Sequence, residues 1–140
     1  MENLLKYAWG LTSGVCALLV PVRGLIVCAM VFVAIDFVTG VIASRCRARR
    51  AHLAWSFSSR RAWNTVVKLI FVMAGIVLAW MLESVVLTFA ELHLAKIFTG
   101  FVCGVEFRSY LENAADISEH PLFTALKTLV KGKIDRTLDK

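Results

Sequence analysis

The sequence GLIVCAMVFVAIDFVTGVIASRCRARR occupies residues 24–50 and joins a long apolar run to a dense group of arginines. Within residues 24–44, Asp36 is the one charged side chain. About 20 helical residues are enough to cross the hydrocarbon core of a bilayer. Loops rich in Arg and Lys stay on the cytoplasmic side of a membrane. The stretch therefore predicts a membrane-spanning helix whose C-terminal end faces the cytoplasm.

A second apolar run follows the arginines and covers residues 69–82 and 85–90. The segment between the two runs contains no Asp or Glu, and its cations are Arg45, Arg47, Arg49, Arg50, Arg60, Arg61 and Lys68. Each basic residue near an anionic membrane surface contributes about 1 kcal/mol of attraction. We therefore expect these residues to set the topology and to contact anionic lipid headgroups.

The overall composition excludes an ordinary soluble domain. Of the 140 residues, 59% are hydrophobic, and the mean hydropathy is +0.71. The polar residues of such a chain cannot cover a surface that faces water. The net charge of +6 is concentrated in the central loop and the C-terminal tail, which favours a topological role over nucleic-acid binding. We predict an all-α integral membrane protein with a single domain over residues 1–140.

Three segments are predicted to be transmembrane helices, residues 24–44, 63–83 and 94–115. The connection before the last of them holds Glu83, Glu91 and His93 and no Lys or Arg before Lys96, as expected of a loop outside the cytoplasm. The last segment is less apolar at its inner end. That end must therefore meet protein, water or headgroups rather than lipid tails.

Residues 4–22 are apolar enough to form a further helix. This helix either crosses the membrane, giving four crossings and a cytoplasmic N-terminus, or lies along the outer surface, giving three. Its length favours a crossing, whereas Arg23 at an outer turn counts against one. We favour four crossings, and both arrangements place the arginine-rich loop in the cytoplasm.

Residues 118–138 read as an amphipathic helix that begins near Pro121. Leu122, Leu126 and Leu129 recur at helical spacing among basic residues. This pattern is typical of a helix at the cytoplasmic membrane surface. The alternative is a helix that packs on a partner's helix.

Asp36 is the most informative polar residue because a carboxylate at the centre of a transmembrane helix costs roughly 2.5–3.5 kcal/mol on insertion scales. Thr39 and Gly40 lie on the same helix face, which makes a stripe suited to close helix contact. Three interpretations remain open for Asp36. It holds the bundle together, faces a pore or a neighbouring copy, or acts as a proton-relay or catalytic acid.

A second polar face contains Glu106, Ser109 and Asn113, at i, i+3 and i+7 of one helix, with Glu112 beside it. These side chains either hydrogen-bond across helices or mark the point where the helix leaves the membrane. Together with Asp36, Thr39 and Gly40 they are the candidate polar residues for helix–helix contact or for a pore lining.

Neither catalysis nor cofactor binding is indicated. The four cysteines form no CxxC pair and have no histidine at metal-ligand spacing, so we expect free thiols and no metal site. No nucleophile–base pair and no glycine-rich phosphate loop is present. We expect a protein that is not an enzyme and has no cofactor.

Three motifs in a fixed order resemble the bacteriophage holin family, which also contains the toxin-secretion holins. They are Asp36-Phe37-Val38-Thr39-Gly40, then Ser58-Ser59-Arg60-Arg61 leading to Lys68, and then Glu106-Phe107-Arg108-Ser109-Tyr110-Leu111-Glu112-Asn113. The resemblance covers roughly residues 25–135. It implies a small protein of the bacterial cytoplasmic membrane that forms homo-oligomers and opens lesions for an endolysin or a toxin.

Two other functions stay open. The chain could anchor or scaffold a larger envelope complex, with its loop and tail docking a soluble partner. A small proton-coupled transporter that uses Asp36 is less favoured, because the sequence shows neither an inverted repeat nor a pair of broken helices.

Overall fold

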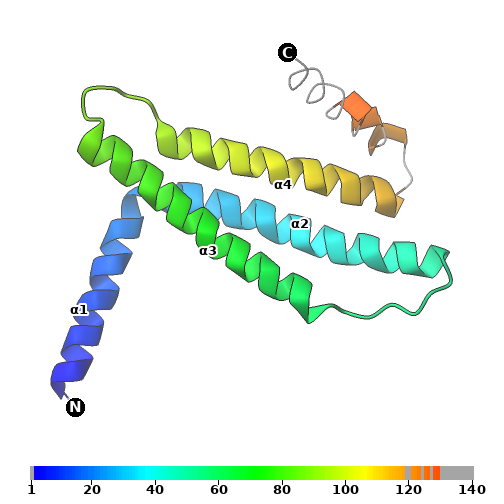
Figure 1. Ribbon diagram of the computed structural model, residues 1–140, viewed down its shortest axis with the longest axis horizontal. Helices are drawn as coiled ribbons and strands as arrows, with labels where there is room; N and C mark the ends of the chain where they lie inside the picture. The colour runs from blue at the N-terminus through cyan, green and yellow to red at the C-terminus, as the bar shows by residue number, and fades with distance from the viewer. Residues whose placement is uncertain (1, 119–120, 124, 127, 130–140) are drawn as a thin grey trace.

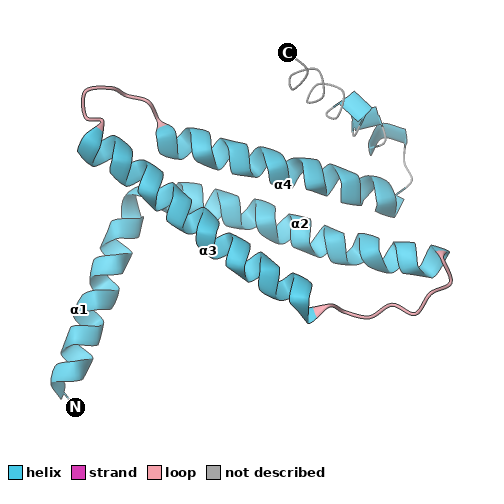
Figure 2. Cartoon of the chain, in the orientation of Figure 1, coloured by secondary structure: helices cyan, strands magenta, loops and turns pink. Residues whose placement is uncertain are grey.

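Long helices account for most of the chain. The computed structural model describes residues 2–118, 121–123, 125–126 and 128–129. Over these residues the secondary structure is helical with connecting loops and contains no strand (Figure 2). The predicted all-α class is therefore confirmed for the described part of the chain.

Three helices form the body of the protein: α2 (Arg23–Arg50), α3 (Ser59–Met81) and α4 (Leu94–Ser118). At a rise of 1.5 Å per residue, each is longer than the roughly 30 Å hydrocarbon core of a bilayer. The helices extend beyond the segments chosen from hydropathy alone. Because Arg and Ala favour helices, α2 continues to Arg50, and the arginines from Arg45 onward project from its last turns instead of lying in a loop.

The three helices alternate in direction (Figure 1). α2 and α4 lie side by side and run the same way, while α3 runs oppositely and packs against both. The beginnings of α2 and α4 therefore share one end of the bundle with the end of α3. The 51–58 loop lies at the other end, as successive crossings of a membrane would require.

A small apolar core lies at the end of the bundle where α2 begins. Its buried members are Val22, Ile26, Ala29, Val72 and Ile76. Beside it α3 approaches α4 so closely that a Cβ on Gly75 would lie 2.5 Å from Cζ of Phe98. A side chain at position 75 would therefore displace the Phe98 ring, and glycine lets the two helices pack closely here.

The outer surfaces of the bundle are apolar. Two helical stretches are long and apolar enough to cross a membrane, Val20–Arg50 and Ser59–Val86. In their most apolar windows only 17% and 6% of the residues are buried, unlike the core helices of soluble proteins. Ile70, Phe71 and Phe101 are among the large side chains that stay exposed. Such surfaces suit contact with lipid tails.

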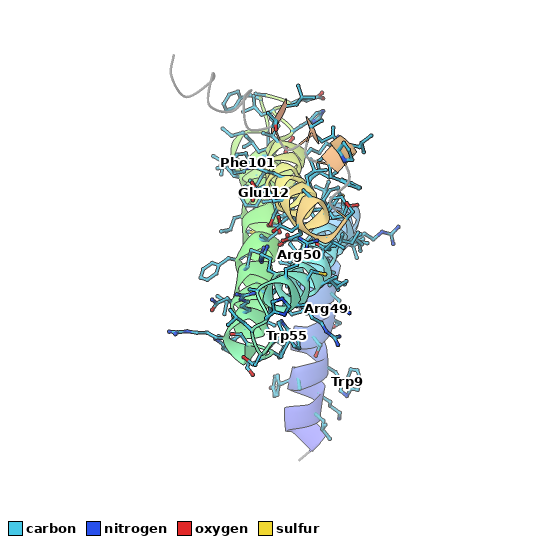
Figure 3. The ribbon with its side chains drawn as sticks, turned by 90° about the vertical axis from the view of Figure 1, so that its right-hand side faces the viewer. Trp9, Arg49, Arg50, Trp55, Phe101 and Glu112 are labelled. Atoms are coloured by element: carbon cyan, nitrogen blue, oxygen red, sulfur yellow. The ribbon has the colours of Figure 1, made fainter. Side chains whose placement is uncertain are left out.

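Helix α1 (Glu2–Leu19) stands apart from the bundle. A 3₁₀ turn at Val20–Val22, which contains Pro21, separates it from α2. Figures 1 and 3 show α1 leaving the start of α2 crosswise to the bundle, and Tyr7 and Trp9 are fully open to the surroundings at 79% and 73% exposure. The number of membrane crossings remains a prediction.

The C-terminal segment is described only in part. Residues 121–123, 125–126 and 128–129 are helical, and Leu122, Leu126 and Leu129 are exposed. The rest of the amphipathic helix predicted over residues 118–138 lies outside the described residues.

Candidate functional site

A cluster of charged and polar side chains lies between the three apolar helices, and each helix contributes to it. Asp36 comes from α2, Lys68 from α3, and Glu106 and Asn113 from α4. The helical periodicity explains the placement, because Glu106 and Asn113 are seven residues apart and therefore share a face of α4. We call these four residues the charged cluster.

Lys68 is the cation of the charged cluster. Its Nζ donates a hydrogen bond to Oε2 of Glu106 at 2.8 Å and lies 3.9 Å from Oδ2 of Asp36. The Glu106 side chain is 6% exposed and that of Asp36 16%, so both carboxylates are largely removed from the surroundings. One ammonium group is thus shared between two acids from two different helices.

Asn113 ties α4 to α2 directly. Its Nδ2 donates to Oδ1 of Asp36 at 3.0 Å and lies 3.5 Å from Oγ1 of Thr39. Thr39 donates its own hydroxyl proton back to the Ile35 carbonyl at 2.8 Å. Gly40 completes this contact, because a Cβ there would lie 3.4 Å from Nδ2 of Asn113. The Asp36, Thr39 and Gly40 stripe is therefore part of the surface that α2 presents to α4.

The remaining predicted residues of α4 divide into two groups. Ser109 lines a cleft of about 300 Å³ together with Asp36, Gly40 and Asn113. Glu112 instead lies near Arg108 on the outside of α4, at 3.5 Å, with 43% of its side chain exposed. Ser109 therefore lies next to the charged cluster, and Glu112 does not.

The sequence patterning does not assign Lys68 to the charged cluster. Lys68 is grouped there with the arginines that are expected to contact lipid headgroups. Its signal was present: Lys68 is the first charged residue within the apolar part of α3, seven residues beyond Arg61. A cation at that depth needs an acidic partner inside the bundle. Pairing two helices by charge alone was not possible without knowing how they are rotated.

The arginines lie at the end of the bundle that carries the 51–58 loop. Figure 3 looks at this end, where Arg49, Arg50 and Trp55 gather. Arg47 forms an ion pair with Asp116 of α4. The guanidinium carbon of Arg45 lies 5.8 Å from the centre of the Trp55 ring, a cation–π contact. The two other basic residues of the predicted loop, Arg60 and Arg61, are exposed in the first turn of α3.

The opposite end of the bundle holds a separate polar contact. Oε1 of Glu83 accepts a hydrogen bond from the backbone N–H of His93 at 2.9 Å and lies 3.4 Å from Nδ1 of the same residue. This contact joins the π-helical turn Leu82–Val86, which directly follows α3, to the loop that precedes α4. It lies apart from the charged cluster.

The charged cluster acts as a fastening within a single chain. Among the described residues, every buried side-chain nitrogen or oxygen has a hydrogen-bond partner. Hydrogen bonds between membrane helices contribute about 0.6 kcal/mol each on average. Removing one partner of a buried ion pair costs far more, about 3–5 kcal/mol, because an uncompensated charge remains. The charged cluster can therefore hold three helices together in lipid. Separating the helices requires new partners for these charged and polar side chains.

Comparison with known proteins gives a match to one protein-family model. Residues 13–132 match the model of the bacteriophage holin family. Neither the curated proteins nor the solved structures include a match to the chain. The matched range contains the charged cluster, the arginine-rich end of α2 and all of α3.

Proposed function

Because this chain belongs to the bacteriophage holin family, we propose that it self-associates in a bacterial cytoplasmic membrane and opens lesions that release an endolysin or a toxin. The family is one of non-enzymatic membrane proteins, and two helices of this chain have the length and composition of membrane spans. The proposal that follows concerns how the chain opens lesions once it is inserted in the membrane.

The observation that carries the proposal is a charged cluster that lies between helices whose outer surfaces are apolar. In one copy Lys68 offsets part of the negative charge of Asp36 and Glu106, which lowers the cost of placing these groups among apolar helices. A lesion filled with water needs polar surfaces, and Asp36, Lys68 and Glu106 are the charged groups at membrane depth that can supply them. Opening would exchange their mutual contacts for contacts with water.

In this mechanism neighbouring copies are not needed to bury these polar residues. Contacts within one chain already satisfy them. Assembly would then be driven by packing between lipid-facing helix surfaces, as for other membrane helices. The charged cluster would control when the assembled copies convert from a closed to an open state.

We also propose three crossings, with α1 lying along the outer membrane surface. The crosswise direction of α1 supports this arrangement, since a helix perpendicular to a spanning bundle lies in the membrane plane (Figure 1). Lys6, Gly10 and Ser13 share one face of α1 and leave the opposite face apolar, which is typical of interfacial helices. The arginine-rich end and the C-terminus would face the cytoplasm.

The test is inducible expression in bacteria with a membrane-potential dye, with and without an endolysin that lacks a signal peptide. We expect abrupt depolarisation in both cultures and lysis only when the endolysin is present. The Asp36→Leu and Glu106→Leu proteins should insert into the membrane. Cells that express them should show no depolarisation, or a strongly changed time of onset. Glu112→Leu is the matched control, because it removes an acid of the same helix that lies outside the charged cluster.

Two results would contradict the proposal. One is a normal membrane potential in cells that contain abundant inserted protein, and the other is full lytic activity of both cluster variants. Purification in mild detergent then identifies the alternative. A stable complex with one soluble protein, in place of a homo-oligomer, would indicate a scaffold.

A further inference from the structure

A second cleft lies beside the 51–58 loop, at the arginine-rich end of the bundle. Its volume is about 200 Å³, and its lining includes Ser44, Trp55, Ser56, Ser58 and Arg61. One water molecule occupies about 30 Å³ in the liquid, so the space is sufficient for a phosphodiester group. We call this space the loop cleft.

The chemistry of the loop cleft favours an anion. Three serine hydroxyls and one arginine contribute to its lining, and no carboxylate does. Ser44 accepts a hydrogen bond from Nε1 of Trp55 at 3.3 Å, which leaves its own hydroxyl proton available for donation. Arginine and hydroxyl donors together are a common way to hold phosphate oxygens.

No ion pair joins Arg61 to an acid among residues 2–118, and the same holds for Arg60 beside it. Arg47, by comparison, is paired with Asp116, and Lys68 with Glu106. Arg61 borders both the loop cleft and the larger cleft that contains Ser109. A cation between two polar clefts, without an acidic partner of its own, is suited to an external anion.

The aromatic residues of the loop indicate where this anion would come from. Trp55 is 38% exposed and Phe57 52% exposed, and Arg45 lies over the Trp55 ring. Aromatic side chains next to arginines are typical of the boundary between headgroups and lipid tails. A ligand whose phosphate is attached to acyl chains fits this boundary better than a free ion.

We propose that the loop cleft binds the phosphodiester headgroup of an anionic phospholipid, with Arg61 as its principal cation. This proposal rests on the proposed topology, in which the 51–58 loop lies at the cytoplasmic membrane surface. Bound lipid would connect the C-terminal end of α2 to the first turn of α3, and would make the packing of these helices sensitive to the anionic lipid content.

The test uses the full chain in lipid nanodiscs, with Trp9, Trp63 and Trp80 replaced by Phe so that Trp55 alone fluoresces. Brominated phosphatidylglycerol in a phosphatidylcholine background is compared with brominated phosphatidylcholine in the reverse mixture. We expect phosphatidylglycerol to be enriched roughly fivefold near Trp55, the effect of one basic residue near the surface. Arg61→Gln should remove most of this enrichment.

Arg60→Gln is the matched control, because it removes an equal charge one residue away but does not border the loop cleft. Arg61→Lys should retain part of the enrichment, and circular dichroism verifies that each variant keeps its helices. Equal quenching by the two brominated lipids, or equal losses in the Arg60 and Arg61 variants, would overturn the proposal. So would displacement of the lipid by millimolar inorganic phosphate, which would identify a free-phosphate site.

Depolarisation of cells is measured separately, so that the two proposals fail in different ways. A chain without headgroup preference that still depolarises cells would refute only the lipid site. A chain with the preference but without depolarisation would refute the lesion-forming function and leave the lipid site standing.

Discussion

At the scale of single residues, Lys68 has the largest influence on the charged cluster. It is the common partner of Glu106 and Asp36, and Asp36 also accepts a hydrogen bond from Asn113 of α4. The loss of Lys68 leaves two largely buried carboxylates beside each other. The loss of the Glu106 charge leaves Lys68 with Asp36. The two losses are therefore unequal in free energy.

We predict that Lys68→Gln lowers the free energy of unfolding by about 2–3 kcal/mol, because it leaves buried Glu106 and half-buried Asp36 without their cation. The 40% exposure of the Lys68 side chain keeps the loss below that of a fully buried ion pair. Glu106→Gln should cost only about 1 kcal/mol, since an amide can still accept a hydrogen bond from Lys68. Thermal unfolding of the purified protein in detergent measures both effects. Lys96→Gln is the control, because Lys96 is exposed and lies at the opposite end of α4. Equal losses in the two cluster variants would show that Lys68 does not bridge both acids.

At the scale of helices, two contacts define how α4 is placed. Its N-terminal half meets α3 where Gly75 lies against Phe98, and it meets α2 where Sγ of Cys28 lies 3.9 Å from Sγ of Cys103. The charged cluster fastens the other half. The three contacts fix the rotation of α4, which could not be derived from periodicity because α4 carries polar residues on more than one face.

Gly75→Leu should separate α3 from α4, because a larger side chain would overlap the ring of Phe98. Overpacking of this kind costs about 1–3 kcal/mol, so we expect a clearly lowered unfolding temperature in detergent. Gly104→Leu provides the comparison, since a Cβ at that glycine would meet nothing within 4 Å. If both variants unfold at the same temperature, α3 and α4 do not pack through Gly75.

The cysteine pair offers a direct test of the α2–α4 contact. A membrane-permeable thiol oxidant should link Cys28 to Cys103 within one chain and consume both thiols, which maleimide labelling and intact mass detect. Cys28→Ser should abolish the link although Cys16 and Cys46 remain. We expect the linked protein to depolarise cells later than the reduced protein, with reversal by a reductant. Links that form only between copies would contradict this helix arrangement.

At the scale of the whole molecule, the distinctive feature is that α1 does not join the bundle. Helices α2, α3 and α4 pack together in alternating directions, and α1 departs crosswise from the end where α2 begins (Figure 1). The apolar composition of α1 left two arrangements open. Its direction relative to the bundle supports the proposed surface arrangement, because a fourth crossing would run alongside the other three.

We predict that α1 lies on the outer surface. In a chain whose four cysteines are replaced by serine, Tyr7→Cys should react in intact spheroplasts with a maleimide that cannot cross the membrane. Ser56→Cys, in the 51–58 loop, should react only after the membrane is permeabilised, and serves as the internal control. Protection of position 7 until permeabilisation would instead support the four-crossing arrangement.

The sequence by itself determined the properties that depend on one segment at a time. Hydropathy and charge identified α2, α3 and α4, and helical spacing put Asp36 with Thr39 and Gly40, and Glu106 with Asn113, on single faces. Ordered motifs identified the family that residues 13–132 match. These features can be recognised because helix periodicity and the bilayer thickness are fixed lengths along the chain.

Only the tertiary structure decided which polar groups meet. It paired Lys68 with Glu106 and Asp36, placed Glu112 outside the charged cluster, and turned α1 away from the bundle. The physical reason is that such contacts depend on the rotation and sliding of three helices relative to one another. Close packing at Gly75 and at Gly40 sets that rotation, and neither contact is visible in the periodicity of a single helix.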